Sequence, residues 1–79
     1  MDKAIHSAAQ DALTRLLREH RVRAGLRQVD IAQRIGEPQS FVSKYESGER
    51  RLDWYEIDQI CAAIGIDSIE LMKEHRAAT

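Results

Sequence analysis

The sequence contains few of the residues that cross-link or rigidify a small protein. Its 79 residues include one cysteine, one proline, one tryptophan, two tyrosines and one phenylalanine. Because Cys61 is the only cysteine, no disulfide framework can form, and stability must come from a hydrophobic core of marginal size. A single unpaired cysteine is typical of a reducing, cytoplasmic compartment. We therefore expect one domain over residues 1–79.

Long apolar runs are absent as well. No stretch of the sequence approaches the roughly 20 apolar residues that a membrane-spanning helix needs. The N-terminus also lacks the continuous apolar core and the cleavage site of a signal peptide. The sequence thus favours a soluble, cytoplasmic protein that does not associate with membranes.

Net charge is almost absent, but the charges are unevenly distributed. The formal charge is −1 and the isoelectric point is about 6.3, whereas proteins that bind nucleic acids usually carry a basic footprint. Residues 15–51 nevertheless hold nine lysines and arginines against five acidic residues, a net charge of +4, while residues 52–79 sum to −4. The middle of the chain is therefore the part suited to an anionic partner.

Apolar residues recur at helical spacing in five segments, and no segment alternates as a half-buried strand does. We expect an all-α fold with helices from residue 7 or 11 to 23, over 28–35 and 39–46, and two more opened by Asp53 and Asp67. Each of these aspartates is followed three residues later by a glutamate, Glu56 or Glu70. That spacing is the pattern of a capping box.

The segment from Gln28 to Ser47 has the layout of two short helices hinged at a glycine, a helix-turn-helix. Ala32 is small enough for two helices to cross closely, Gly36 tolerates the left-handed backbone that ends a helix, and Val42 anchors the second helix. The side chains expected to face inward are Ile31, Ile35, Val42 and Tyr45. Those expected to face solvent are Gln33, Arg34, Gln39, Ser40, Ser43 and Lys44.

The outward face of the second motif helix carries groups suited to the edges of DNA bases. A glutamine amide can pair with N6 and N7 of adenine, and a lysine can reach O6 and N7 of guanine or a phosphate. We expect Gln39 and Lys44 to read bases, with Ser40 and Ser43 beside them. The alternative is that all four simply form a solvated helix face.

Further residues complete a family pattern around this motif. They are Gly25 to Gln28, Ala32, Gly36, Gln39 to Lys44, Glu46 to Arg51 and Ala63 to Ile66. At these positions, over about residues 12–72, the chain resembles the Cro and phage-repressor family, also called XRE-like. The resemblance implies a compact five-helix, lambda-repressor-like domain with the motif at helices two and three. It also implies binding of double-stranded operator DNA as a two-fold homodimer.

Other site residues follow from matched positions in the family. Gln28 falls on a position that contacts a backbone phosphate, although it could instead only cap its helix. Arg21 and Glu46 fall on positions that form a structural ion pair between helix one and the end of helix three. Arg50 and Arg51 lie in the loop after the recognition helix and are expected to bind phosphates, the alternative being that they only aid solubility.

Two departures from the family pattern affect the start of helix three. Glu37 stands where the family usually has an apolar residue. Pro38 stands where a serine or threonine usually caps the helix, and it cannot cap with its side chain, although its fixed φ suits a helix entry. These departures leave the start of helix three less well specified than its middle.

Several residues are of types that bind metals or act in catalysis, but their spacing argues against both roles. The histidines His6, His20 and His75 have no metal-ligand spacing among themselves or with Cys61, and we expect them at the surface. His6, Ser7 and Asp11 lie too close in sequence to form an oriented nucleophile with an oxyanion hole. Phe41 and Trp54 are expected in the core or shielding it. We expect no enzyme, metal, cofactor or small-molecule ligand.

The sequence therefore predicts a sequence-specific DNA-binding transcriptional regulator, acting as a repressor by occupying a roughly palindromic operator. Two alternatives remain open. One is an antitoxin or restriction-modification controller that uses the same domain. The other is a protein-interaction module that has lost DNA binding, in keeping with the mild acidity. Helix five and the N-terminal residues are the candidates for the homodimer contact.

Overall fold

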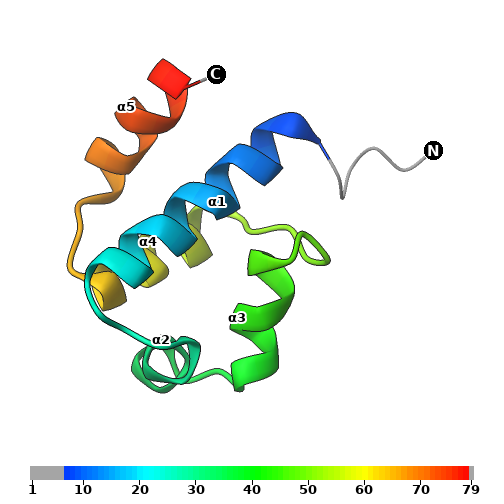
Figure 1. Ribbon diagram of the computed structural model, residues 1–79, viewed down its shortest axis with the longest axis vertical. Coiled ribbons are helices and arrows are strands. Elements are labelled where there is room, and N and C mark those ends of the chain that lie inside the picture. Colours follow the sequence, from blue (N-terminus) through cyan, green and yellow to red (C-terminus); the bar gives the residue numbers. More distant parts are fainter. Residues whose placement is uncertain (1–6, 79) are drawn as a thin grey trace.

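Five helices form the regular structure of residues 7–78, the part of the chain that the computed structural model describes (Figure 1). They are α1 (Ala8–Arg23), α2 (Gln28–Ile35), α3 (Gln39–Glu46), α4 (Trp54–Ile64) and α5 (Ser68–Ala78). There is no strand among these residues, so the expected all-α, five-helix order is confirmed. His6 lies outside the described residues.

Side chains before the helices satisfy their first backbone N–H groups. The Ser7 hydroxyl accepts from the N–H of Gln10 at 3.1 Å. At α4 the expected capping box is present, since Asp53 accepts from the N–H of Glu56 at 2.8 Å and Glu56 accepts from the N–H of Asp53 at 3.0 Å. These contacts fix where the helices begin.

The capping box expected at α5 is not what the structure has. The Asp67 carboxylate accepts from the N–H of Ile69 at 2.8 Å. The carboxylate of Glu70 lies 3.5 Å from Nζ of Lys73, one turn further along the exposed face of α5. A lysine three residues later offers Glu70 an ion pair that competes with the cap.

The hinge between α2 and α3 is closed by a left-handed glycine. Gly36 has a φ of 73°, and the N–H of Glu37 donates to the carbonyl of Ala32 at 3.0 Å. This pair of features is a Schellman ending, which only a residue without a Cβ adopts at little cost. Pro38 then occupies the N-cap of α3 with extended backbone and no side-chain cap. Glu37 and Pro38 therefore leave the start of α3 where it was expected.

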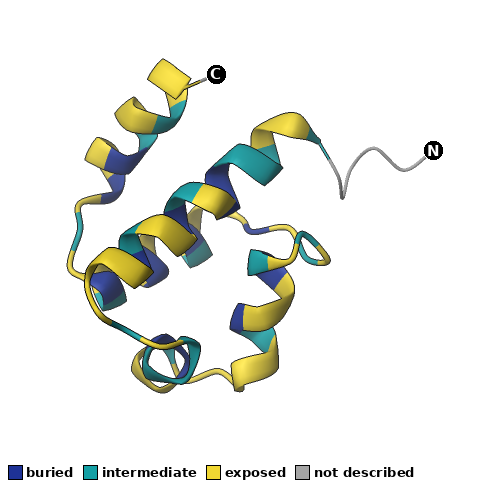
Figure 2. Cartoon of the chain, in the orientation of Figure 1, coloured by how far each residue is buried: buried dark blue, intermediate teal, exposed yellow. Residues whose placement is uncertain are grey.

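One core joins all five helices. Helix α1 packs on α3, α4 and α5, while α2 packs on α3 and α4. The apolar residues with almost no exposed surface line the inner sides of the helices (Figure 2). They are Leu13, Leu17, Ile31, Ala32, Val42, Tyr45, Leu52, Ile57, Ile60, Cys61, Ile64 and Leu71. Burial raises the pKa of the Cys61 thiol to about 11, so this cysteine behaves as a small apolar side chain.

Helix α5 lies at the end of the molecule away from α2 and α3 (Figure 1) and is tied to α1 by two histidines. His20 Nε2 is 2.7 Å from a carboxylate oxygen of Glu74, and His75 Nε2 is 2.9 Å from the carbonyl of Ala9. Both histidines are half-buried. They were expected at the surface, because their spacing in sequence gives no sign that α5 folds back on α1.

Candidate nucleic-acid interface

The two sides of α3 differ sharply in exposure. Val42 and Tyr45 are buried in the core. The four side chains predicted to read bases are all exposed on the other side of the helix: Gln39, Ser40, Ser43 and Lys44. On α2 the inward positions Ile31 and Ala32 are buried, as the motif requires, while Ile35 is half-buried. Helix α3 thus presents a polar face to solvent.

Arg21 of α1 and Glu46 of α3 form a bidentate ion pair. Nε and Nη2 of Arg21 donate to the two Glu46 oxygens at 2.7 and 3.0 Å, and Nη1 donates to the carbonyl of Leu26 at 2.8 Å. Their side chains are only 10% and 4% exposed. The hydrogen bonds that Arg21 donates to Glu46 hold the pKa of Arg21 above its ordinary value, against the opposing effect of burial. The pair therefore fixes the end of α3 against α1.

Gln28 extends this ion pair to the start of the recognition helix. Its Nε2 donates to Glu46 at 3.0 Å, and its Oε1 accepts from Nε2 of Gln39 at 3.4 Å. A chain of contacts thus runs from Arg21 on α1 to Gln39, the first residue of α3. The sequence alone predicted that Gln28 contacts a phosphate or caps its helix. It gave no sign that Gln28 bridges Glu46 and Gln39, because the side chains in this chain of contacts come from three helices.

Arg27 is a basic residue at this surface that the sequence analysis did not single out. It precedes α2, and its Nε and Nη2 donate to the Asp30 carboxylate at 3.1 and 2.9 Å. The hydrogen bonds from Arg27 lower the pKa of Asp30 to about 2. The Arg27 side chain is 77% exposed. The sequence did hold a signal for Arg27: it precedes Gln28 at the N-terminus of α2, where the helix dipole attracts anions.

The two arginines of the loop after α3 differ in their surroundings. Arg50 is half-buried, donates to both carboxylate oxygens of Glu56 at 3.1 and 2.9 Å, and lies over the ring of Phe41. Arg51 is exposed. Helix α4 begins with Trp54 and Tyr55, which are 47% and 69% exposed. Trp54, expected in the core or shielding it, lies outside the core, since Leu52 and Ile57 supply the buried side chains on either side of it. That it shields the core stays a prediction.

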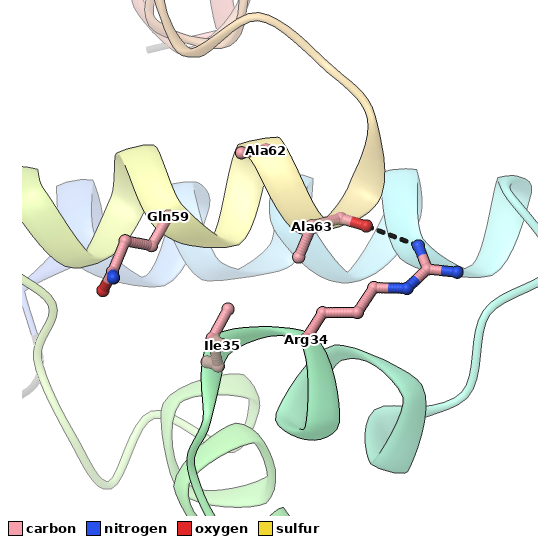
Figure 3. Close-up of a pocket in the computed structure, with 5 residues that line it drawn as sticks. All are labelled: Arg34, Ile35, Gln59, Ala62 and Ala63. Atoms are coloured by element: carbon pink, nitrogen blue, oxygen red, sulfur yellow. Dashed lines mark hydrogen bonds between the residues drawn. The ribbon is translucent and has the colours of Figure 1, made fainter.

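Two open grooves lie beside the motif. One, of about 390 Å³, runs along α3 and is lined by Glu37, Pro38, Ser40, Phe41, Lys44, Glu49 and Arg50. The other, of about 440 Å³, separates α2 from α4, and Figure 3 shows Arg34 reaching across it. Its Nη1 donates to the carbonyl of Ala63 at 2.7 Å. Arg34 thus satisfies a carbonyl in the last turn of α4, which is a structural role.

Two other kinds of site are absent from residues 7–78. No group of three or more histidine, cysteine, aspartate or glutamate side chains in this range is placed to hold a metal ion. No helix in the same range is long and apolar enough to span a membrane.

Comparison with known proteins places the chain in a family. A family model described as "Helix-turn-helix domain" matches residues 12–74. The solved structure of an XRE-family like protein from Pseudomonas syringae pv. tomato is 48% identical, with a TM-score of 0.88 over 98% of this chain and 94% of that one. No curated protein sequence gives a significant match.

Two restriction-modification controller proteins are also similar in structure. C.AhdI from Aeromonas hydrophila is 31% identical, with a TM-score of 0.74 over 81% of this chain and 97% of that one. C.Esp1396I, solved as a tetramer with its natural 35 base-pair operator, is 15% identical with a TM-score of 0.84 over 91% and 95% of the two chains, a likeness of fold alone. By the matched domain and the 48% identity, the chain belongs to the XRE-like family of helix-turn-helix proteins.

Proposed function

We propose that this protein is a transcriptional regulator that binds specific sites in double-stranded DNA. The observation that carries the proposal is the exposed polar face of α3, whose residues Gln39, Ser40, Ser43 and Lys44 lie opposite the buried Val42 and Tyr45. An α-helix fits the major groove of B-DNA, where each base pair presents a distinct pattern of donors and acceptors. The structural neighbour C.Esp1396I was solved in complex with its operator, which agrees with DNA binding by this fold.

In this proposal Gln39 is the main reader of bases. One N–H of its amide donates to Gln28 at 3.4 Å, which leaves its second N–H and its oxygen for N7 and N6 of an adenine. Lys44, a turn and a half later, reaches a guanine or a phosphate. The contact with Gln28 orients the amide before DNA arrives, which lowers the entropy lost on binding.

Phosphate contacts lie on both sides of α3. On one side Gln28 and Arg27 stand at the N-terminus of α2, where the helix dipole attracts an anion. On the other side Arg51 stands exposed in the loop before α4. We propose that these groups set the register of the protein on DNA, whereas the α3 face supplies the specificity.

The regulator acts as a homodimer in this proposal. Two copies related by a two-fold axis place two α3 helices about 34 Å apart, which is one turn of B-DNA. Repression by occupying the operator is the simplest outcome. A restriction-modification controller is the second candidate, because C.AhdI is 31% identical over 81% of the chain. The regulator acts in the cytoplasm and has no catalytic role.

The test is a comparison of two substitutions on a panel of operator variants, after selection of bound sites from a random duplex pool. Gln39→Ala should cost about 1 to 3 kcal/mol of binding on the preferred site and much less on a site already mutated at the matching base pair. Arg51→Ala should weaken binding similarly on all sites and lower the slope of log affinity against log salt by about one unit. If Gln39→Ala leaves the ranking of sites unchanged while Arg51→Ala reorders it, these roles are refuted. A wild-type protein that selects no duplex would refute DNA binding and favour a protein-interaction module.

A further inference from the structure

Arg50, in the loop between α3 and α4, is held by three groups of the protein itself. Nη1 and Nη2 donate to the two oxygens of Glu56 at 3.1 and 2.9 Å. Nη1 also donates to the carbonyl of Arg51 at 2.9 Å. The guanidinium carbon lies 4.4 Å from the centroid of the Phe41 ring. Forked hydrogen bonding and ring stacking together use the planar guanidinium in a way that a lysine cannot reproduce.

The two side-chain partners of Arg50 are anchored in different helices. Phe41 belongs to α3 and meets the buried Tyr45 edge to face, with 5.8 Å between ring centroids. Glu56 belongs to the first turn of α4, where it also accepts from the N–H of Asp53. We call Phe41, Arg50 and Glu56 the loop clamp. It joins the recognition helix to the N-terminus of α4 and to the backbone of the loop between them.

We propose that the loop clamp is a positioning device for DNA binding, in which Arg50 fixes the loop that carries Arg51 and does not itself contact a phosphate. The inference rests on the proposed function and replaces the earlier assignment of Arg50 to a phosphate contact. Both terminal nitrogens of Arg50 already donate to protein oxygens. These contacts use three of its five N–H groups, and a phosphate on the remaining two would stand beside the Glu56 carboxylate, which repels it.

The two possible roles of Arg50 predict opposite effects of neutralising Glu56. If Arg50 positions the loop, Glu56→Gln weakens the clamp and the loop loses its fixed place, so DNA binding becomes weaker. If Arg50 binds phosphate, Glu56→Gln removes both a competitor for the guanidinium and a negative charge near DNA, so binding becomes tighter. The sign of the change therefore decides between the roles.

The experiment measures the binding of a selected duplex by fluorescence anisotropy at several salt concentrations. We expect Glu56→Gln, Phe41→Leu and Arg50→Gln each to weaken binding about tenfold, which corresponds to about 1.4 kcal/mol. Arg50→Gln should leave the slope of log affinity against log salt unchanged, because Arg51 still contacts its phosphate in the complex and only the cost of ordering the loop is added. The matched control is Glu49→Gln, which removes an acidic charge from the same loop region. It should leave binding unchanged or make it slightly tighter.

Two further measurements keep the test decisive. Circular dichroism and thermal midpoints show whether each variant is folded at the assay temperature. If Glu56→Gln is not folded, Arg50→Lys decides, since it keeps the charge and loses the fork. If Arg50→Lys binds DNA as weakly as Arg50→Gln does, the positioning role is supported. If Arg50→Lys binds nearly as tightly as the wild type, the positioning role is overturned. Tighter binding by Glu56→Gln, or a salt slope that falls by about 0.9 in Arg50→Gln, also overturns the inference. Failure of the wild type to bind any duplex would instead refute the proposed function.

Discussion

At the scale of single residues, burial decides how much an ion pair contributes to stability. The side chains of Arg21 and Glu46 are 10% and 4% exposed, whereas those of Lys73 and Glu70 are 71% and 68% exposed. Exposed pairs are worth under about 1 kcal/mol because water screens them. Removing one partner of a buried pair leaves the other charge without compensation, which costs about 3 to 5 kcal/mol.

Glu46→Ala should therefore destabilise the domain by about 3 kcal/mol or more. The loss has two causes: the Arg21 guanidinium keeps its burial without a carboxylate, and Gln28 loses an acceptor. Urea unfolding measures the effect, with Glu70→Ala as the matched control on an exposed pair. A Glu46→Ala midpoint no lower than that of the control would show that the pair contributes nothing to stability.

Because of the Arg27–Asp30 ion pair, the stability of the folded protein should depend on pH in the acidic range. The pKa of Asp30 is about 2 in the folded protein against an ordinary value of 3.8. A lowered pKa means that the stabilisation is present above about pH 4 and is lost as pH falls to about 2. Asp30→Asn should be less stable than wild type at neutral pH and should lose less stability over that window. Thermal unfolding between pH 2 and 7 measures this, with the exposed Glu19→Gln as a control, and equal slopes for Asp30→Asn and wild type would contradict it.

At the scale of elements, backbone geometry at the hinge places α3 relative to α2. Gly36 has a φ of 73°, and a Cβ built on it would meet no atom within 4 Å. Any cost of adding a side chain there is therefore conformational strain and not a clash. The α3 residues proposed to read bases begin three residues after this hinge, so the hinge sets the angle at which they are presented.

Gly36→Ala should accordingly cost about 1 kcal/mol, because an L-residue resists the left-handed region. In a domain of this size that corresponds to a fall of roughly 4 to 8 °C in the melting temperature. Differential scanning calorimetry measures it. Gln33→Ala, at an exposed position of α2 with ordinary helical backbone, is the control and should be neutral or slightly stabilising. If Gly36→Ala has the same melting temperature as Gln33→Ala, the hinge accommodates the added Cβ without strain.

At the scale of the whole molecule, apolar side chains remain exposed on α4 and α5, two helices that pack on each other. Tyr55 and Ile69 are 69% and 55% exposed. The hydroxyl of Ser68 donates to Asp58 at 2.7 Å. Asp58 lies one turn after Tyr55, so this bond ties the start of α5 to the face of α4 that carries Tyr55. The two apolar residues therefore lie on adjoining helices. We propose a second copy of the chain as the partner of this surface, in keeping with the expected role of helix five.

Ile69→Ser should therefore weaken the homodimer, raising by about tenfold the concentration at which two chains occupy one operator, or about 1.4 kcal/mol. Val22→Ser is the matched control, since Val22 is 52% exposed but belongs to α1. Light scattering with the operator duplex gives the stoichiometry. One chain on every selected site would exclude the dimer, and equal effects of the two substitutions would place the contact elsewhere.

The sequence by itself determined the helices and the motif. The ranges 28–35 and 39–46 coincide with α2 and α3, because apolar spacing, the hinge glycine and capping residues are local signals that act within one turn of helix. The exposure of Gln39, Ser40, Ser43 and Lys44 also follows from that spacing. The family was recognisable at the same stage, since its characteristic residues lie along the motif.

Only the tertiary structure decided which distant side chains meet. The bridge from Glu46 through Gln28 to Gln39, the loop clamp around Arg50, and the two histidines that join α5 to α1 all connect residues of different helices. Such contacts depend on helix crossing angles and loop geometry, which local patterns do not encode. The capping box at α5 is a local matter instead, since Glu70 pairs with Lys73 of the same helix. The exposure of Trp54 was decided by the tertiary structure, because the assembled core takes up Leu52 and Ile57 and leaves Trp54 47% exposed.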